Sequence, residues 1–149
     1  MGINCAYEDL EIDKQIIGEE IFIKKELPKD FAEASLDYNP LHLDPSWMDK
    51  TNFGKTKFKG VIVHGMFTFS IITKMITDWL LPIGGIHRRL ETRWLKPIYP
   101  GDTITPQAVI FAKKKTIKGN WVLLKVRVTR QDGEVVAEGE SMEEFPNNQ

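Results

Sequence analysis

The sequence predicts an α+β fold in which an antiparallel sheet of about five strands wraps one long central helix. Two patterns carry this prediction. Residues 65–81, in the middle of the chain, form the strongest helix candidate. Four stretches with the two-residue alternation of β-strands follow in the second half. A helix that is apolar on nearly every side is buried, and a sheet curved around it covers most of that surface.

Length and composition fit one globular domain over residues 1–149. Apolar residues make up 42% of the chain and charged residues 28%, which is typical of soluble folded proteins. The net charge of −1 argues against a general nucleic-acid-binding protein, because such proteins are strongly basic. Cys5 is the only cysteine, so an intrachain disulfide and a cysteine-based metal cluster are both excluded.

No stretch reaches the roughly 18 uninterrupted apolar residues that a membrane-spanning helix needs. The longest candidate, residues 61–81, carries polar side chains such as His64, Lys74 and Asp78. The first ten residues lack the basic start and apolar run of an export signal. We therefore expect a cytoplasmic protein with no membrane partner.

Proline and capping residues divide the first half of the chain into short elements. Asn39 precedes a proline and is therefore disfavoured in a helix, which indicates a turn. Asp44 followed by Pro45 is typical of a helix start, because Asp caps free N–H groups and proline suits the first helical position. The predicted elements are a strand within residues 18–25, a helix over 29–36, a turn at 37–40, a helix over 45–50 and a polar loop over 51–59.

The second half is predicted to be a run of hairpins. Pro82 and Gly84 end the central helix. His87, among arginines on the first strand, is expected at the surface. One side of the helix and one sheet edge remain uncovered, so we expect a homodimer or a higher homo-oligomer. The predicted strands cover residues 86–94, 103–112, 122–129 and 135–142, with hairpin turns at 118–120 and 131–133.

A carboxylate and an imidazole flank the Asn-Pro turn and are the first candidate for chemistry. Asp37 and His42 are five residues apart, and a tight turn between them lets both side chains converge. Together they suit the activation of a water molecule, since an imidazole titrates near neutral pH. Asn39 is placed to hold the same water. Alternatively, Asp37 only caps the turn through its own backbone, and His42 is a hydrogen-bonded core residue.

The start of the central helix is the second candidate. His64 and Gly65 lead directly into it. A glycine there allows a ligand oxygen to approach the backbone, and the free N–H groups and the helix dipole favour negative charge. That is the arrangement of an oxyanion hole. Alternatively, Gly65 only permits close packing of helix on sheet, and His64 packs or caps.

Taken together, these stretches resemble the MaoC-like, (R)-specific enoyl-CoA hydratase family, which has the hot-dog fold. The order and spacing of three motifs match over most of the chain, from about residue 18 to residue 145. The motifs are Asp37-x-Asn39-Pro40-Leu41-His42-x-Asp44, Val63-His64-Gly65-Met66 and Trp94-Leu-Lys-Pro97-Ile-Tyr-Pro-Gly101-Asp102-Thr.

The resemblance implies reversible hydration of a trans-2-enoyl-CoA to a (3R)-3-hydroxyacyl-CoA. It implies that Asp37 and His42 are the catalytic pair and that the N–H of Gly65 binds the thioester oxygen. Asn39, His64 and Thr73 are then expected to bind substrate, and no metal or cofactor besides the CoA thioester substrate is expected. The chain departs from the family pattern at Leu36, where many members have glycine.

Other functions stay open from the sequence. One is a (3R)-hydroxyacyl-carrier-protein dehydratase, which runs the same chemistry in reverse. A thioesterase is a more distant enzyme, and a non-catalytic acyl-thioester-binding subunit is another class. Two lysine groups are candidates for contact with carrier phosphates, although solvated lysines are the commoner explanation. These groups are Lys55, Lys57 and Lys59, and Lys113, Lys114, Lys115 and Lys118.

Overall fold

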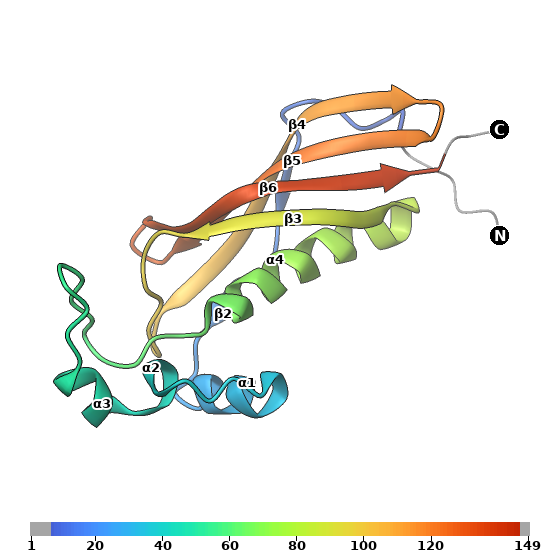
Figure 1. The fold of residues 1–149 in the computed structure, drawn as a ribbon. Coiled ribbons are helices and arrows are strands. Elements are labelled where there is room, and N and C mark those ends of the chain that lie inside the picture. The colour runs from blue at the N-terminus through green and yellow to red at the C-terminus, as the bar shows by residue number, and fades with distance from the viewer. Residues whose placement is uncertain (1–6, 147–149) are drawn as a thin grey trace.

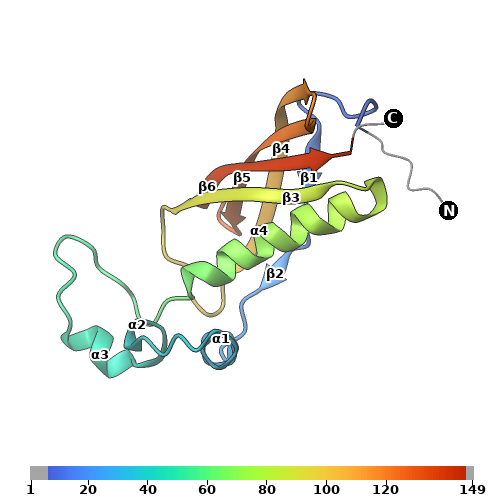
Figure 2. The same ribbon diagram turned by 45° about the vertical axis from the view of Figure 1, so that its right-hand side comes forward.

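The computed structural model describes residues 7–146, and Cys5 lies outside them. A curved antiparallel sheet wraps one long helix (Figures 1 and 2). The strands are β1 (Gln15–Ile17), β2 (Ile21–Phe22), β3 (Ile86–Trp94), β4 (Thr103–Thr116), β5 (Gly119–Arg130) and β6 (Val135–Phe145). The helices are α1 (Leu27–Ser35), α2 (Pro40–Leu43), α3 (Pro45–Lys50), α4 (Gly65–Leu80) and the 3-10 helix η1 (Leu81–Ile83).

The sheet confirms the predicted α+β architecture with one strand more than expected. Its order is β1-β4-β5-β6-β3, and β2 also pairs with β4. The sequence prediction missed β1, and it made the next strand too long, because only Ile21–Phe22 pair with β4. Both short strands use the free edge of the much longer β4.

The hairpins arise where predicted, with one shift. β4 and β5 pair through to Thr116 and Gly119, so the turn is at Ile117 and Lys118, and Gly119 already belongs to β5. The turn between β5 and β6 lies at residues 131–134. Alternate residues of β5 face the core, as the sequence pattern requires. Its buried residues include Val122, Leu124, Val126 and Val128.

Helix α4 packs its apolar side into the curve of the sheet. Ile72 and Ile76 are completely buried, and Leu80 is nearly so. The helix also has a solvent-exposed side in the single chain, where Lys74 and Asp78 form an ion pair at 2.6 Å. Among the described residues, the helical run Gly65–Ile83 is long and apolar enough to cross a membrane by length and composition alone. One third of that window is buried inside the described structure.

The three short helices gather beyond the N-terminal end of α4 (Figures 1 and 2). Helix α3 begins as predicted, because the side chain of Asp44 accepts the N–H groups of Ser46 and Trp47. Helix α2 replaces part of the predicted turn. It forms because Asn39 caps it by accepting the N–H of Leu41, and Pro40 occupies its first position.

The expectation that His87 lies at the surface is wrong. Its side chain is only 16% exposed, and its Nδ1 lies 2.8 Å from Oε2 of Glu143, which is fully buried. Burial raises the pKa of the Glu143 carboxyl, and the hydrogen bond with His87 acts in the opposite direction. The pair lies between β3 and β6, where His87 is the register partner of Glu143.

Candidate active site

Three titratable side chains meet at the N-terminal end of α4. Asp37 comes from the linker between α1 and α2, His42 from α2, and His64 directly precedes α4. One oxygen or nitrogen atom from each lies within 4.8 Å of the others. The turn therefore brings Asp37 and His42 together as predicted, and the fold adds His64.

Asp37 is exposed, and the residue before it has an unusual backbone conformation. Leu36 ends α1 in the left-handed conformation, with φ of 61°. Glycine adopts that conformation without steric cost, which gives a physical reason for the glycine expected at this position. Oδ1 of Asp37 accepts the N–H of Asn39 at 3.2 Å. The turn-capping role is therefore present, and a carboxylate retains further acceptor capacity for a ligand.

His42 is buried and its ring orientation is fixed by the backbone. Its Nδ1 lies 2.7 Å from the carbonyl oxygen of Ile62. A carbonyl can only accept, so Nδ1 carries the hydrogen and Nε2 of the neutral ring has a free lone pair. Burial lowers the pKa of His42, the bond to Ile62 raises it, His64 lowers it and Asp37 raises it. The net lowering favours the neutral form, which is the form able to take a proton.

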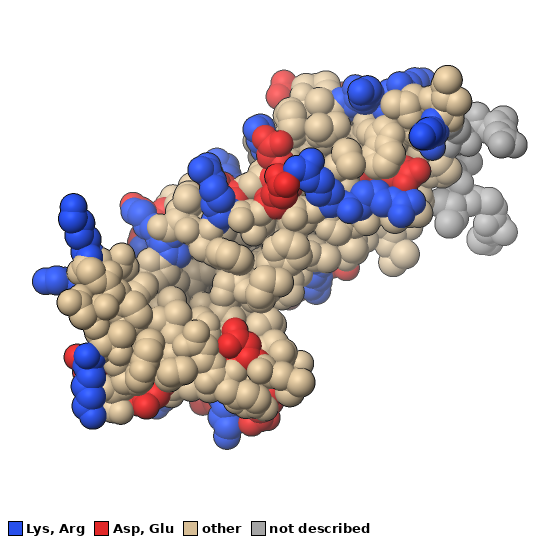
Figure 3. Space-filling model, viewed as in Figure 1, with Lys and Arg blue, Asp and Glu red and all other residues tan. Residues whose placement is uncertain are grey.

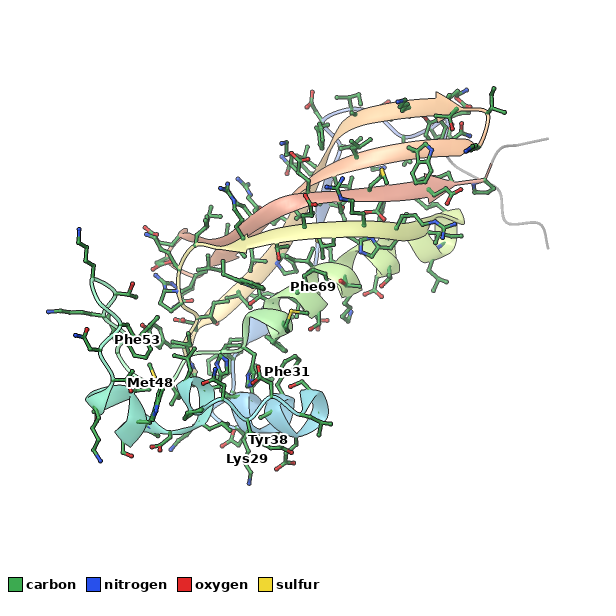
Figure 4. The ribbon with its side chains drawn as sticks, in the orientation of Figure 1. Lys29, Phe31, Tyr38, Met48, Phe53 and Phe69 are labelled. Atoms are coloured by element: carbon green, nitrogen blue, oxygen red, sulfur yellow. The ribbon has the colours of Figure 1, made fainter. Side chains whose placement is uncertain are left out.

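His64 is almost completely buried, at 1% exposure. Its Nε2 lies 3.0 Å from the main-chain oxygen of Asp37. Its ring stacks on that of His42, with centroids 3.8 Å apart and planes 24° apart. Phe31 lies against it, with ring centroids 5.0 Å apart, and projects from the side of α1 that faces α4 (Figure 4).

Two imidazoles and a carboxylate are also a ligand set that zinc accepts. Metal-bound imidazoles direct their nitrogen lone pairs, which lie in the ring planes, at one point. Here the rings of His42 and His64 are stacked nearly parallel. Their in-plane lone pairs therefore do not converge on a common position, and the arrangement favours acid–base chemistry.

Gly65 is the first residue of α4 and is in tight contact with the indole of Trp94. Nε1 of Trp94 donates to the carbonyl oxygen of Gly65 at 2.9 Å. A β-carbon at position 65 would lie 2.6 Å from Cε2 of that ring, so only glycine fits there without displacement. The first N–H groups of a helix have no partner within the helix. The packing role of Gly65 and a role in binding an oxyanion are therefore compatible.

The side chains of two other predicted site residues form hydrogen bonds with main-chain groups close to them in sequence. Oδ1 of Asn39 caps α2 through the N–H of Leu41 at 3.0 Å. The hydroxyl of Thr73 donates to the carbonyl oxygen of Phe69, 3.1 Å away within α4. Asn39 neighbours the cluster in sequence, but neither side chain is part of it. Their substrate-binding roles stay predictions.

The sequence prediction overlooked two features of the site. Trp94 is part of the resemblance, but the contact of Trp94 with Gly65 joins residues 29 positions apart. It depends on how α4 packs against β3. The stacking of His64 on His42 likewise has no signal in the sequence. The sequence indicates only that His64 stands immediately before a helix start.

The two lysine groups lie in different places. Lys113 donates to the main-chain oxygens of Tyr7 and Leu10, and Lys115 pairs with Glu8. Their hairpin is at the end of the sheet opposite to α1–α3 (Figure 1). A structural role therefore explains both of these lysines.

The loop that carries the other lysines starts after α3 and returns to the site at Ile62. A T-shaped aromatic contact between Phe53 and Phe58, with centroids 4.9 Å apart, supports it. Figure 3 shows basic side chains projecting at this end of the molecule. The exposed lysines of the loop are Lys55, Lys57 and Lys59.

Comparison with known proteins identifies the family. The model of the MaoC like domain matches residues 11–132. The chain belongs to this family. It is 30% identical over 118 residues to an (R)-specific enoyl-CoA hydratase of Aeromonas caviae, covering 78% of this chain and 81% of that relative. It is 29% identical over 120 residues to a mitochondrial 3-hydroxyacyl-[acyl-carrier-protein] dehydratase of Arabidopsis thaliana, covering 80% and 68%.

Solved structures agree with this assignment. An R-hydratase of Pseudomonas aeruginosa in its unliganded form superposes with a TM-score of 0.78 at 28% identity, covering 97% of this chain and 88% of that one. The predicted hot-dog fold is thereby confirmed, and the MaoC-like chain belongs to a family of hydratases and dehydratases. Relatives of both kinds match at similar identity, so the comparison does not separate the two activities.

The contact between Gly65 and Trp94 gives a stability prediction. Gly65→Ala forces the indole or the helix start to move, and overpacking of this kind costs about 1–3 kcal/mol of unfolding free energy. Trp94→Ala removes the obstacle. In the double variant we expect a loss smaller than the sum of the two single losses by more than about 0.5 kcal/mol. Chemical denaturation of the four proteins measures this, and additive losses would contradict the contact.

Proposed function

We propose that this MaoC-like protein hydrates trans-2-enoyl-CoA reversibly to (3R)-3-hydroxyacyl-CoA. One observation carries the proposal: the Asp37 carboxylate and the His42 imidazole lie together beside the first turn of α4. An acid–base pair next to free helical N–H groups suits a reaction in which water adds to a double bond while an enolate forms. The 30% identity with an (R)-specific enoyl-CoA hydratase supports the same reaction.

In the proposed mechanism, Asp37 and His42 hold one water molecule. Nε2 of His42 has the lone pair to accept a proton from it, because Nδ1 is engaged by Ile62. The water oxygen bonds to Cβ, the Cα–Cβ double bond opens, and the thioester becomes an enolate. The proton taken from the water is then returned to Cα. Hydroxyl and hydrogen both come from one face, so the addition is syn, and water is consumed with no other reactant.

The negative charge of the enolate is on the thioester oxygen, and we propose that the N–H of Gly65 stabilises it. The free N–H groups and the dipole of α4 favour an anion at that end. Removing one such donor costs about 10²–10³ in rate in other enzymes. The indole of Trp94 holds the carbonyl of the same residue and so fixes the first turn.

We propose that the protein acts in the cytoplasm as a homodimer or higher homo-oligomer, without metal or other cofactor. Strand β3 forms an open edge of the sheet. Large apolar side chains are half-exposed at its two ends, where Ile86 is 51% exposed and Trp94 is 53% exposed. An open strand edge with apolar flanks is a natural pairing surface for a second copy.

A (3R)-hydroxyacyl-carrier-protein dehydratase is the second candidate. The observation that favours it is the 29% identity with the Arabidopsis dehydratase. The same residues would act in reverse order: a proton leaves Cα, and the hydroxyl leaves Cβ as water. The two candidates differ in the carrier, CoA or a protein, and not in the reacting atoms.

Asp37→Asn tests the proposed reaction. It removes the carboxylate charge that helps to hold and activate the water, at an exposed position with almost no change in volume, so we expect normal folding and a loss in turnover of crotonyl-CoA of about 10²–10⁴-fold. The decrease in enoyl-thioester ultraviolet absorbance measures the rate. Asp49→Asn, also exposed and on the nearby helix α3, is the matched control and should turn over like the unaltered protein. Turnover by Asp37→Asn within twofold of the unaltered protein would rule out the assigned role.

The loop lysines make a prediction about the carrier. We expect replacement of Lys55, Lys57 and Lys59 by Gln to raise KM for crotonyl-CoA about tenfold, because an exposed ion pair is worth about 0.2–1 kcal/mol and CoA carries three phosphates. KM for a crotonyl-pantetheine, which lacks them, should not change. Lys114→Gln with Lys118→Gln, at the far hairpin, is the control. Equal effects on both thioesters would contradict a phosphate contact at this loop.

A further inference from the structure

His64 is the most enclosed side chain of the site, and its burial limits what it can do. It is 1% exposed, the His42 ring stacks on it, and the Phe31 ring lies against it in a tilted contact. A residue with so little accessible surface has no room for direct contact with an acyl thioester. A role exerted through its neighbours suits this burial better than direct contact with the substrate.

One hydrogen bond places a hydrogen on the His64 ring. Nε2 donates to the main-chain oxygen of Asp37 at 3.0 Å, because a carbonyl can only accept. Nδ1 is buried and has no hydrogen-bond partner among the described residues. Nε2 of His64 therefore carries a hydrogen and is engaged by the main chain of Asp37.

The contacts of His64 reach both members of the proposed catalytic pair. Its N–H holds the carbonyl of Asp37, the residue that follows the strained Leu36, and so restrains the main chain from which the carboxylate projects. Its ring lies flat against that of His42, at 3.8 Å between centroids. His42 is thus held at Nδ1 by the carbonyl of Ile62 and on one face by His64. Asp37 and His64 are the titratable groups that face it.

We propose that His64 is a positioning residue that locks Asp37 and His42 into one relative geometry. This inference rests on the proposed function of that pair. His64 supplies no proton and touches no reacting atom. It joins the main chain of one member of the pair to the ring of the other, across 27 residues of sequence. Misplacement of a reacting group by about 1 Å can cost 10²-fold in rate, so such a link matters for turnover.

Two substitutions separate the two contacts. His64→Phe keeps a flat ring against His42 but removes the N–H that holds Asp37. We expect kcat to fall about tenfold or more with KM for crotonyl-CoA unchanged within twofold.

His64→Gln keeps an N–H donor but removes the ring. We expect the acid limb of the kcat profile to shift to higher pH, because His42 loses a face that shields it from water and its pKa rises towards the ordinary histidine value.

These readouts distinguish positioning from other roles. A tenfold rise in KM with unchanged kcat in His64→Phe would indicate a substrate contact and overturn the proposal. A kcat profile of His64→Gln with the same acid limb as the unaltered protein would overturn the stacking role. Thermal unfolding of each variant shows whether it is folded at the assay temperature.

The unaltered protein gives a test that needs neither turnover nor a variant. Nitrogen-15 shifts of the imidazole rings, followed from about pH 5 to 8, report tautomer and charge. We expect Nε2 of His64 to carry a hydrogen, and His42 in its neutral form to carry hydrogen on Nδ1. A His64 ring without hydrogen on Nε2 would overturn the proposal. If these shifts are as expected and no enoyl thioester is hydrated, the proposed function fails while the described geometry stands.

Discussion

The first turn of α4 is held in place by hydrogen bonds from three other parts of the chain. The N–H of Val63 donates to the carbonyl of Ile98 at 2.8 Å, in the segment between β3 and β4. The indole of Trp94, at the end of β3, donates to Gly65, and the ring of His64 donates to Asp37. The sheet, the helix start and the α1–α2 linker are therefore fixed relative to one another. Each part of the proposed mechanism depends on that arrangement.

The sheet is what makes the N-terminal end of α4 available. Helix α4 contacts β3, β4 and β5, and its buried residues Ile72, Ile76 and Leu80 belong to the hydrophobic core. The short helices α1–α3 then cover that end. Helices of four to nine residues are not stable alone, so caps such as Asn39 and Asp44 and contacts with α4 hold them.

Much of this architecture could be predicted from single elements of the sequence. The alternation of β5, the apolar run of α4 and the Asp44-Pro45 cap each specify local structure, and the structure confirms them. The convergence of Asp37 and His42 followed from one tight turn. The failures were non-local. Strand β1 exists because β4 offers an edge, and His87 is enclosed because its register partner is the buried Glu143.

The position of His64 illustrates the same limit. The resemblance implied that His64 binds substrate, and the alternative was that it packs or caps, but the sequence did not indicate its neighbours, Phe31 on α1 and His42 on α2. No spacing rule connects these residues, since they meet only after the linker of α1 and α2 packs on α4. Conversely, the left-handed conformation of Leu36 agrees with the glycine that the family pattern led us to expect there.

Hydration of trans-crotonyl-CoA in deuterium oxide tests the central claim most directly, namely that Asp37 and His42 act through a single water on one face of the substrate. Nuclear magnetic resonance of the product gives the configurations at Cα and Cβ together. The account predicts a (3R) alcohol with deuterium added to Cα from the same face as the hydroxyl. A (3S) product, or deuterium on the opposite face, would contradict it.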